Sequence, residues 1–134
     1  MCSKEEMDKL IIETASGETI TANEMGIKAL RRIYKERRDV LRGATVTDIL
    51  IGKGAACFLI AGGIKHLNVG VISRAGLDMM QKAGIPVVAR EIVPMIINRK
   101  NDGQCPIENL LRETFEAEEG IKKISAFFND EFSV

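Results

Sequence analysis

The chain has 134 residues, of which 46% are hydrophobic and 28% are charged, and its formal net charge is zero. This length suits one domain with one buried core, and the composition excludes the low hydropathy of a disordered chain. The balanced charge argues against a protein that binds nucleic acid or anionic lipid through general attraction to phosphate groups.

The first expected element is a β-hairpin. Residues 10–14 and 19–22 are short β-favourable runs, and the Ser-Gly-Glu sequence at 16–18 suits the turn between them. Along residues 27–41, apolar side chains recur at helical spacing, and Gly43 is a plausible end of that helix. The helix also has many Lys and Arg residues. Because aromatic residues are not interleaved with them, we interpret this basic face as solvated.

A strand and a buried helix are expected next. Residues 45–46 favour a short strand, and Asp48 stands where the N-cap of the following helix should be. Residues 49–61 are almost entirely apolar and end at Gly62-Gly63, which is typical of a helix stop. A helix that is apolar on all sides must be buried.

The alternation of strands and helices continues along the chain. Residues 67–72 and 87–92 have strand character, and a helix is expected between them at residues 74–83, with Ser73 as its cap. Strand, helix and strand in this order predict parallel strands joined by helical crossovers.

The last third begins with a polar loop at residues 98–103, whose Asn, Asp and Gly residues favour turns. Cys105 then falls at or next to the N-cap of a helix that runs to about residue 115, since Pro106 suits the first helical position. A final amphipathic helix is expected at residues 117–128, with an inner side formed by Ile121, Ile124, Phe127 and Phe128. Without repeats or linkers, residues 1–134 are expected to form a single domain.

Targeting and redox features point to the cytoplasm. The first six residues include acidic side chains and no apolar core, unlike a secretory signal, and the longest apolar run is too short to cross a bilayer. Three cysteines without a short paired spacing favour free thiols over a disulfide framework or a metal knuckle. A membrane partner is not expected, and the sequence does not indicate an oligomeric state.

Two segments resemble the signatures of a known family. They are Thr-Asp-Ile-Leu-Ile-Gly-Lys-Gly-Ala-Ala at residues 47–56, and Pro-Met-Ile-Ile-Asn-Arg at 94–99 continued by Gly-Gln-Cys-Pro-Ile-Glu at 103–108. With Val-Ile-Ser at 71–73 between them, the chain is similar to an uncharacterised prokaryotic family, the domain-of-unknown-function family 1893. The resemblance implies a cytidine-deaminase-like α/β fold, a three-layer α/β/α sandwich whose mixed sheet opens with the β-hairpin. It does not imply deaminase activity.

The zinc site of the deaminases is not expected here. Zinc deaminases have His-x-Glu at one helix start and Pro-Cys-x-x-Cys at the next, which together hold the metal. The corresponding residues, 48–56 and 73–76, include neither a histidine nor a cysteine pair, and His66 lies before the next strand. The sequence thus predicts no metal and points to no other cofactor.

Lys53 is the most suggestive candidate residue, because an ammonium group in an apolar helix needs a partner, a ligand or access to water. In one interpretation, Asp48 caps the helix or pairs with Lys53, whose side chain extends to solvent. In the other, Lys53 and the helix amides bind an anionic group such as a phosphate, with Gly52 and Gly54 allowing close approach. The segment is no Walker loop, since Thr47 replaces its first glycine.

The remaining candidates lie at loops and helix starts. Asn98, Arg99 and Asp102 form a polar group near Cys105, and the guanidinium of Arg99 suits carboxylate or phosphate recognition. A helix N-terminus would lower the pKa of the Cys105 thiol, although no histidine lies near it in sequence to act as a base. Ser73 follows a strand at the edge where α/β sheets bind ligands. Each of these residues also has a purely local interpretation, in capping or in turns.

Together the candidates predict a binding domain for a small molecule, such as a nucleotide-like or phosphate-bearing ligand. One alternative is an enzyme that uses Cys105 or Lys53 in metal-free chemistry. Another is a non-catalytic scaffold or assembly domain. The sequence does not decide whether the protein is an enzyme.

Overall fold

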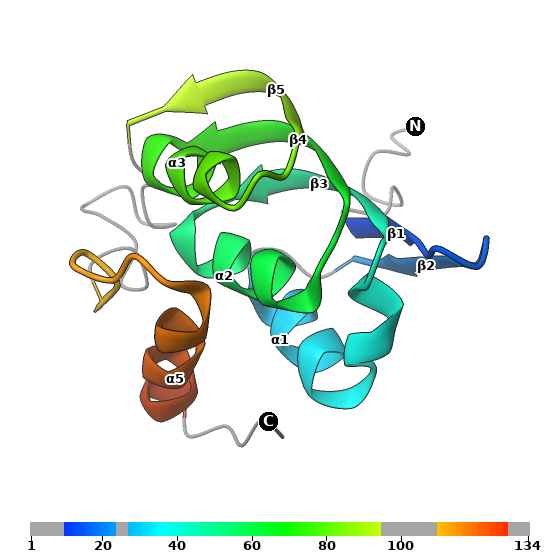
Figure 1. Cartoon of the computed structure of the whole chain (residues 1–134), viewed down its shortest axis with the longest axis horizontal. Helices are drawn as coiled ribbons and strands as arrows, with labels where there is room; N and C mark the ends of the chain where they lie inside the picture. The colour runs from blue at the N-terminus through cyan, green and yellow to red at the C-terminus, as the bar shows by residue number, and fades with distance from the viewer. Residues whose placement is uncertain (1–9, 24–26, 95–109, 129–134) are drawn as a thin grey trace.

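The computed structural model describes residues 10–23, 27–94 and 110–128. One five-stranded sheet runs through it in the order β2-β1-β3-β4-β5 (Figure 1). The strands are β1 (Leu10–Glu13), β2 (Thr19–Ala22), β3 (Thr45–Ile51), β4 (His66–Ser73) and β5 (Val87–Val93). The helices are α1 (Ile27–Glu36), the 3-10 turn η2 (Arg38–Leu41), α2 (Lys53–Gly62), α3 (Arg74–Lys82) and α5 (Ala117–Phe128).

The sheet is mixed, as the sequence predicts. Strand β1 pairs antiparallel with both β2 and β3, so that Leu10 lies opposite Ala22 on one side and opposite Asp48 on the other. Strands β3, β4 and β5 are parallel neighbours joined by α2 and α3. The α/β class and the opening hairpin are therefore confirmed, and the open sheet with its helices is consistent with a three-layer sandwich.

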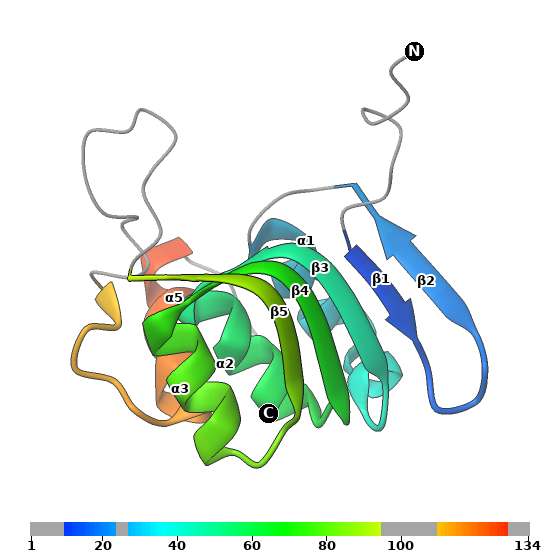
Figure 2. The same cartoon turned by 90° about the horizontal axis from the view of Figure 1, so that it is seen from above.

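Helix α2 is the centre of the core. It packs against α1, α3 and α5, and Figure 2 shows α2, α3 and α5 on the concave side of the curved parallel strands. The rings of Phe58 in α2 and Tyr34 in α1 form a T-shaped pair with a centroid distance of 5.3 Å. Cys57 is fully buried, and its Sγ lies so close to Gly120 of α5 that a Cβ on Gly120 would come within 2.5 Å of it. Within the described ranges, no helix is long and apolar enough to span a bilayer.

The parallel strands bend where Gly70 lies in β4. The pairing of β4 with both of its neighbours breaks at this residue and then resumes in the same register. Val46 and Val69 are buried before the break, whereas Ile51 and Ile72, which have the opposite parity, are buried after it. The side of each strand that faces the core therefore changes at the bend. A Cβ on Gly70 would lie 2.9 Å from the carbonyl oxygen of Ile49, so this close approach of strands requires glycine.

The expected helix at residues 49–61 begins later than predicted. Residues 49–51 continue strand β3, in which Leu50 and Ile51 pair with β4, and α2 starts at Lys53 after Gly52. The prediction of Asp48 as an N-cap is therefore wrong, because Asp48 lies inside the strand. A short apolar run has the same appearance in a buried strand and in a buried helix, and the β-branched Ile49 and Ile51 favour the strand.

Two further expectations need correction. The helix expected at residues 27–41 ends at Glu36, and the chain turns at Arg37 into η2, which brings both Val40 and Leu41 into the core. Phe127 is 53% exposed, although it was expected to face inward with Ile121 and Ile124. Phe128 is instead partly buried against the core and lies under the guanidinium of Arg31.

Candidate functional site

Two helices begin side by side at the carboxyl edge of the parallel strands. Strand β3 leads through Gly52 into α2, and β4 ends at Ser73, which begins α3. A Cβ added to Gly76 would lie 3.1 Å from both the carbonyl carbon and the oxygen of Gly52, so the two helix starts touch. In parallel α/β sheets, ligands bind at this edge because helix amides and strand ends meet there.

The start of α3 is capped by a side chain. The hydroxyl of Ser73 accepts a hydrogen bond from the backbone N–H of Gly76 at 3.0 Å, and Ser73 is fully buried. The expectation that Ser73 caps this helix is confirmed. The next residue, Arg74, is exposed and is the first residue of the helix.

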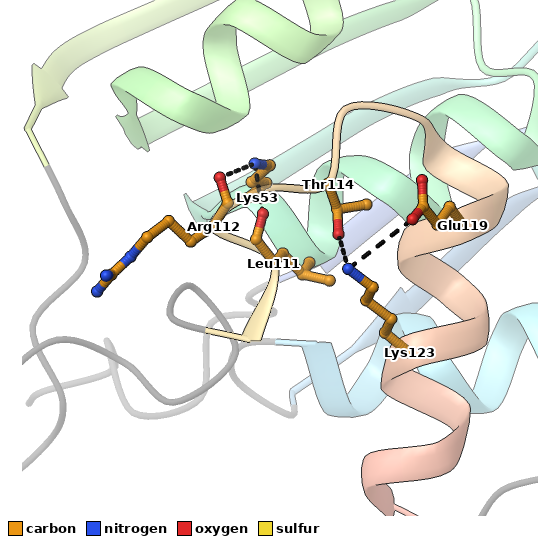
Figure 3. A network of polar contacts seen from close by, with 6 residues as sticks. All are labelled: Lys53, Leu111, Arg112, Thr114, Glu119 and Lys123. Atoms are coloured by element: carbon orange, nitrogen blue, oxygen red, sulfur yellow. Dashed lines mark hydrogen bonds and ion pairs between the residues drawn. The ribbon is translucent and has the colours of Figure 1, made fainter.

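The start of α2 has no side-chain cap, and its first residue is a buried lysine. Lys53 is 5% exposed, and its ammonium group donates hydrogen bonds to the carbonyl oxygens of Leu111 at 2.6 Å and Arg112 at 3.5 Å (Figure 3). The ammonium nitrogen also lies 4.9 Å from the ring centroid of Phe115, within the range of cation–π attraction. The interpretation in which Lys53 extends to solvent is therefore wrong.

A second lysine holds the same segment from its other side. Thr114 is fully buried, and its hydroxyl accepts a hydrogen bond from the ammonium of Lys123 in α5 at 2.6 Å. Lys123 also lies 3.8 Å from the carboxylate of Glu119, one helical turn away. Figure 3 shows the segment between these two lysines. We call residues 110–115 the bridging segment, because it connects the start of α2 to α5.

Asp48 is not the partner of Lys53. Burial raises the pKa of its carboxyl from 3.8 to about 7, and two backbone hydrogen bonds, from Ile49 and Leu50, oppose this rise without cancelling it. A neighbouring ammonium would lower the pKa instead. Asp48 lies in the sheet between Leu10 and Val69, both of which are buried, so its carboxyl is held among apolar neighbours.

A hollow opens beside the start of α3. It has a volume of about 320 Å³ and is lined by Arg74, Ile92, Val93 and Pro94. Its position is the carboxyl end of β5, the edge that the sequence predicts for ligand binding. The sequence interpretation named Ser73 at this edge but missed these four lining residues. The signal available for Arg74 was its place directly after a helix cap.

The remaining sequence candidates cannot be placed. Asn98, Arg99, Asp102 and Cys105 lie outside the described residues, so their predicted roles in ligand binding or chemistry stay predictions. Gly52 lies beside the first turn of α3, which Ser73 caps, whereas the ammonium of Lys53 is bound to the bridging segment. Within the described residues, no three His, Cys, Asp or Glu side chains form a group that could hold a metal ion.

The fold and this edge define an α/β domain with an open mixed sheet and two helix starts in contact. The chain belongs to the DUF1893 family, because residues 2–128 match the family described as a domain of unknown function (DUF1893). The resemblance inferred from the sequence is thereby confirmed at the level of the family, and the cytidine-deaminase-like fold that it implies stays a prediction.

A solved structure supports the same assignment. The chain is similar to the crystal structure of a DUF1893 family protein from Thermotoga maritima, with 28% sequence identity and a TM-score of 0.83. The match covers 94% of this chain and 84% of the other. No curated protein matches the sequence.

Proposed function

We propose that the chain is a binding domain for a small molecule with an anionic group, such as a nucleotide-like or phosphate-bearing ligand. The site is the hollow at the carboxyl edge of β5. The observation that supports it is the position of the Arg74 side chain, which lines a hollow of about 320 Å³ beside the start of α3.

The chemistry of the hollow suits a ligand with two parts. The guanidinium of Arg74 offers a planar set of donors for phosphate or carboxylate, and the positive end of α3 adds to the attraction. Ile92, Val93 and Pro94 provide an apolar wall for the rest of the ligand. The chain runs on from Pro94 toward Asn98, Arg99 and Asp102, and we propose that these residues add further polar contacts.

Binding is better supported than metal-free chemistry. Lys53 would have to leave two backbone carbonyls to act as a nucleophile or a base, and its ammonium is buried. We therefore assign Lys53 a positioning role, in which it fixes the bridging segment against the start of α2. Direct contact between Lys53 and an anionic ligand, and catalysis by Cys105, stay predictions.

A thermal-shift titration tests the proposal with three probes: adenosine monophosphate, ribose 5-phosphate and inorganic phosphate. Binding to the folded state raises stability by about 2.7 kcal/mol when the probe is present at about 100 times its dissociation constant. We expect a stabilisation by at least one phosphorylated probe, and we expect Arg74→Gln to remove it. Loss of the guanidinium fork takes away the bidentate contact to the anion.

Lys82→Gln is the matched control, because it removes one positive charge from the other end of the same helix. This variant should keep the full stabilisation. Equal losses in the two variants would mean that the probes respond to net charge and not to the hollow. A flat response to every probe would contradict the binding function and favour the scaffold alternative.

A further inference from the structure

A second hollow lies at the opposite end of the sheet. Its volume is about 200 Å³, and it opens between the β1–β2 turn and η2. Glu13 at the end of β1 pairs with Thr45 at the start of β3, so this hollow lies at the amino end of β3 and away from the carboxyl edge. Its lining residues are Thr14, Ala15, Ser16, Glu18, Arg37, Asp39, Val40 and Arg42.

The hairpin wall of this hollow is fixed by its own hydrogen bonds. The backbone N–H of Thr14 donates to the carbonyl of Glu18 at 2.8 Å, and that of Gly17 donates to the carbonyl of Thr14 at 3.0 Å. The Thr14 hydroxyl accepts from the N–H of Glu18 at 2.9 Å and lies 3.0 Å from the hydroxyl of Ser16. This wall therefore presents Glu18 from a preorganised turn, which reduces the entropy lost on binding.

Two of the charged side chains of the hollow, Arg37 and Glu18, form a long ion pair. A guanidinium nitrogen of Arg37 lies 3.9 Å from a carboxylate oxygen of Glu18, which is longer than a hydrogen bond, and each side chain is 53% exposed. The side chains of Asp39 and Arg42 make no hydrogen bond or ion pair with another described residue. The hollow thus presents two guanidinium groups and two carboxylates with open hydrogen-bonding positions.

We propose that this hollow binds a small zwitterion of the α-amino acid class. A simple anion would be repelled by the carboxylates of Glu18 and Asp39. A simple cation would be repelled by the guanidinium groups of Arg37 and Arg42. A molecule with both charges satisfies both pairs, with its carboxylate on a guanidinium fork and its ammonium on the acidic side chains. The volume is below the range of about 300 to 1,000 Å³ that drug-sized ligands occupy, which suits a molecule of this size.

This site is independent of the proposed function. It shares no residue with the hollow at Arg74, and it lies at the other end of the parallel strands. A failure of the phosphate titration would therefore leave this proposal standing, and the reverse also holds.

Nuclear magnetic resonance titration of the ¹⁵N-labelled chain tests the proposal with L-alanine, acetate and methylammonium at constant ionic strength. L-alanine should shift the amide signals of Ser16, Gly17 and Val40 in a saturable way, with a dissociation constant on the order of 1 mM because the charges are exposed. Acetate and methylammonium, which each have half of the charge pattern, should bind at least about tenfold more weakly.

Arg42→Gln should weaken L-alanine binding by about tenfold, and it should not weaken methylammonium binding. Lys35→Gln, which removes an exposed cation of α1 outside the hollow, should leave L-alanine binding unchanged. Acetate that binds as tightly as L-alanine would overturn the zwitterion assignment in favour of a simple anion site. The absence of saturable shifts up to about 100 mM L-alanine would overturn the site itself.

Discussion

The two helices that begin at the carboxyl edge differ in how the first turn is capped and in where the first side chain lies. At the start of α2, the first side chain is turned inward, and its ammonium group is taken up by the bridging segment. At the start of α3, a buried serine caps the helix, and the first side chain, Arg74, is left exposed beside a hollow. The first residue of each helix is positively charged. Of these two residues, it is Arg74 that lines the hollow, and Lys53 is buried.

The difference shows that a cation at a helix start is not enough to indicate a ligand. Lys53 is more conspicuous in the sequence because it interrupts an apolar run, and an isolated buried ammonium would be very costly. Hydrogen bonds to backbone carbonyls of the bridging segment offset that cost, and the first of these carbonyls, that of Leu111, lies 58 residues away in the sequence. Arg74 follows an ordinary cap and is easily overlooked. Substitutions at the two helix starts can separate a structural cation from an accessible one.

The largest expected effect is on the bridging segment. Lys53→Met preserves most of the side-chain volume but leaves the buried carbonyl of Leu111 without its charged donor. We expect a loss of about 2 to 3 kcal/mol in the free energy of unfolding, measured by urea denaturation. Hydrogen exchange should show faster opening of residues 110–115, because their anchor to α2 is gone.

Lys123→Met is the matched comparison on the other side of the same segment. Its side chain is 38% exposed, so the hydrogen bond to Thr114 and the long ion pair with Glu119 contribute less. The expected loss is below about 1 kcal/mol. Equal losses of stability in Lys53→Met and Lys123→Met would contradict the expectation that the buried ammonium of Lys53 stabilises the bridging segment more than the partly exposed ammonium of Lys123 does.

The second effect is a pH dependence of the free energy of unfolding. It arises from the carboxyl of Asp48 in β3, the strand that leads into α2. Its carboxyl pKa is raised to about 7 in the folded state from an ordinary value of 3.8, so the folded state holds the proton more tightly. This tighter proton binding stabilises the folded state in full when the pH is below the pKa of Asp48 in the unfolded chain. The stabilisation is lost as the pH rises through the pKa of Asp48 in the folded state. The affected window runs from about pH 4 to pH 7.

Asp48→Asn should remove most of this dependence. A neutral amide replaces the buried carboxylate, so the variant should be more stable than the wild type at pH 8 and similar to it at pH 4. One pKa unit corresponds to about 1.4 kcal/mol, and partial screening by solvent reduces the full shift, so we expect a gain on the order of 2 kcal/mol. If Asp48 were instead paired with Lys53, the substitution would destabilise the protein at pH 8.

The sequence was sufficient where local rules decide the structure. The glycine turn of the hairpin, the cap at Ser73 and the bounds of the last helix at residues 117–128 follow from turn chemistry, capping and periodicity. It failed at residues 49–51, because pairing with β4 decides between strand and helix, and pairing is not local. The partners of Lys53 could not be predicted for the same reason, since the carbonyls of Leu111 and Arg112 have no sequence signature.

The third effect, smaller than those at Lys53 and Asp48, concerns the cap that distinguishes the start of α3. Ser73→Ala removes the acceptor for the N–H of Gly76 and should cost about 1 kcal/mol in the free energy of unfolding. Gln81→Ala, at an exposed position near the end of the same helix, should change stability by less than about 0.5 kcal/mol. Because Ser73 holds the first turn that positions Arg74, the cap variant should also weaken any ligand-induced thermal shift. A cap variant that loses stability but keeps the whole ligand response would show that Arg74 is positioned by β4 and the hollow, without the help of Ser73.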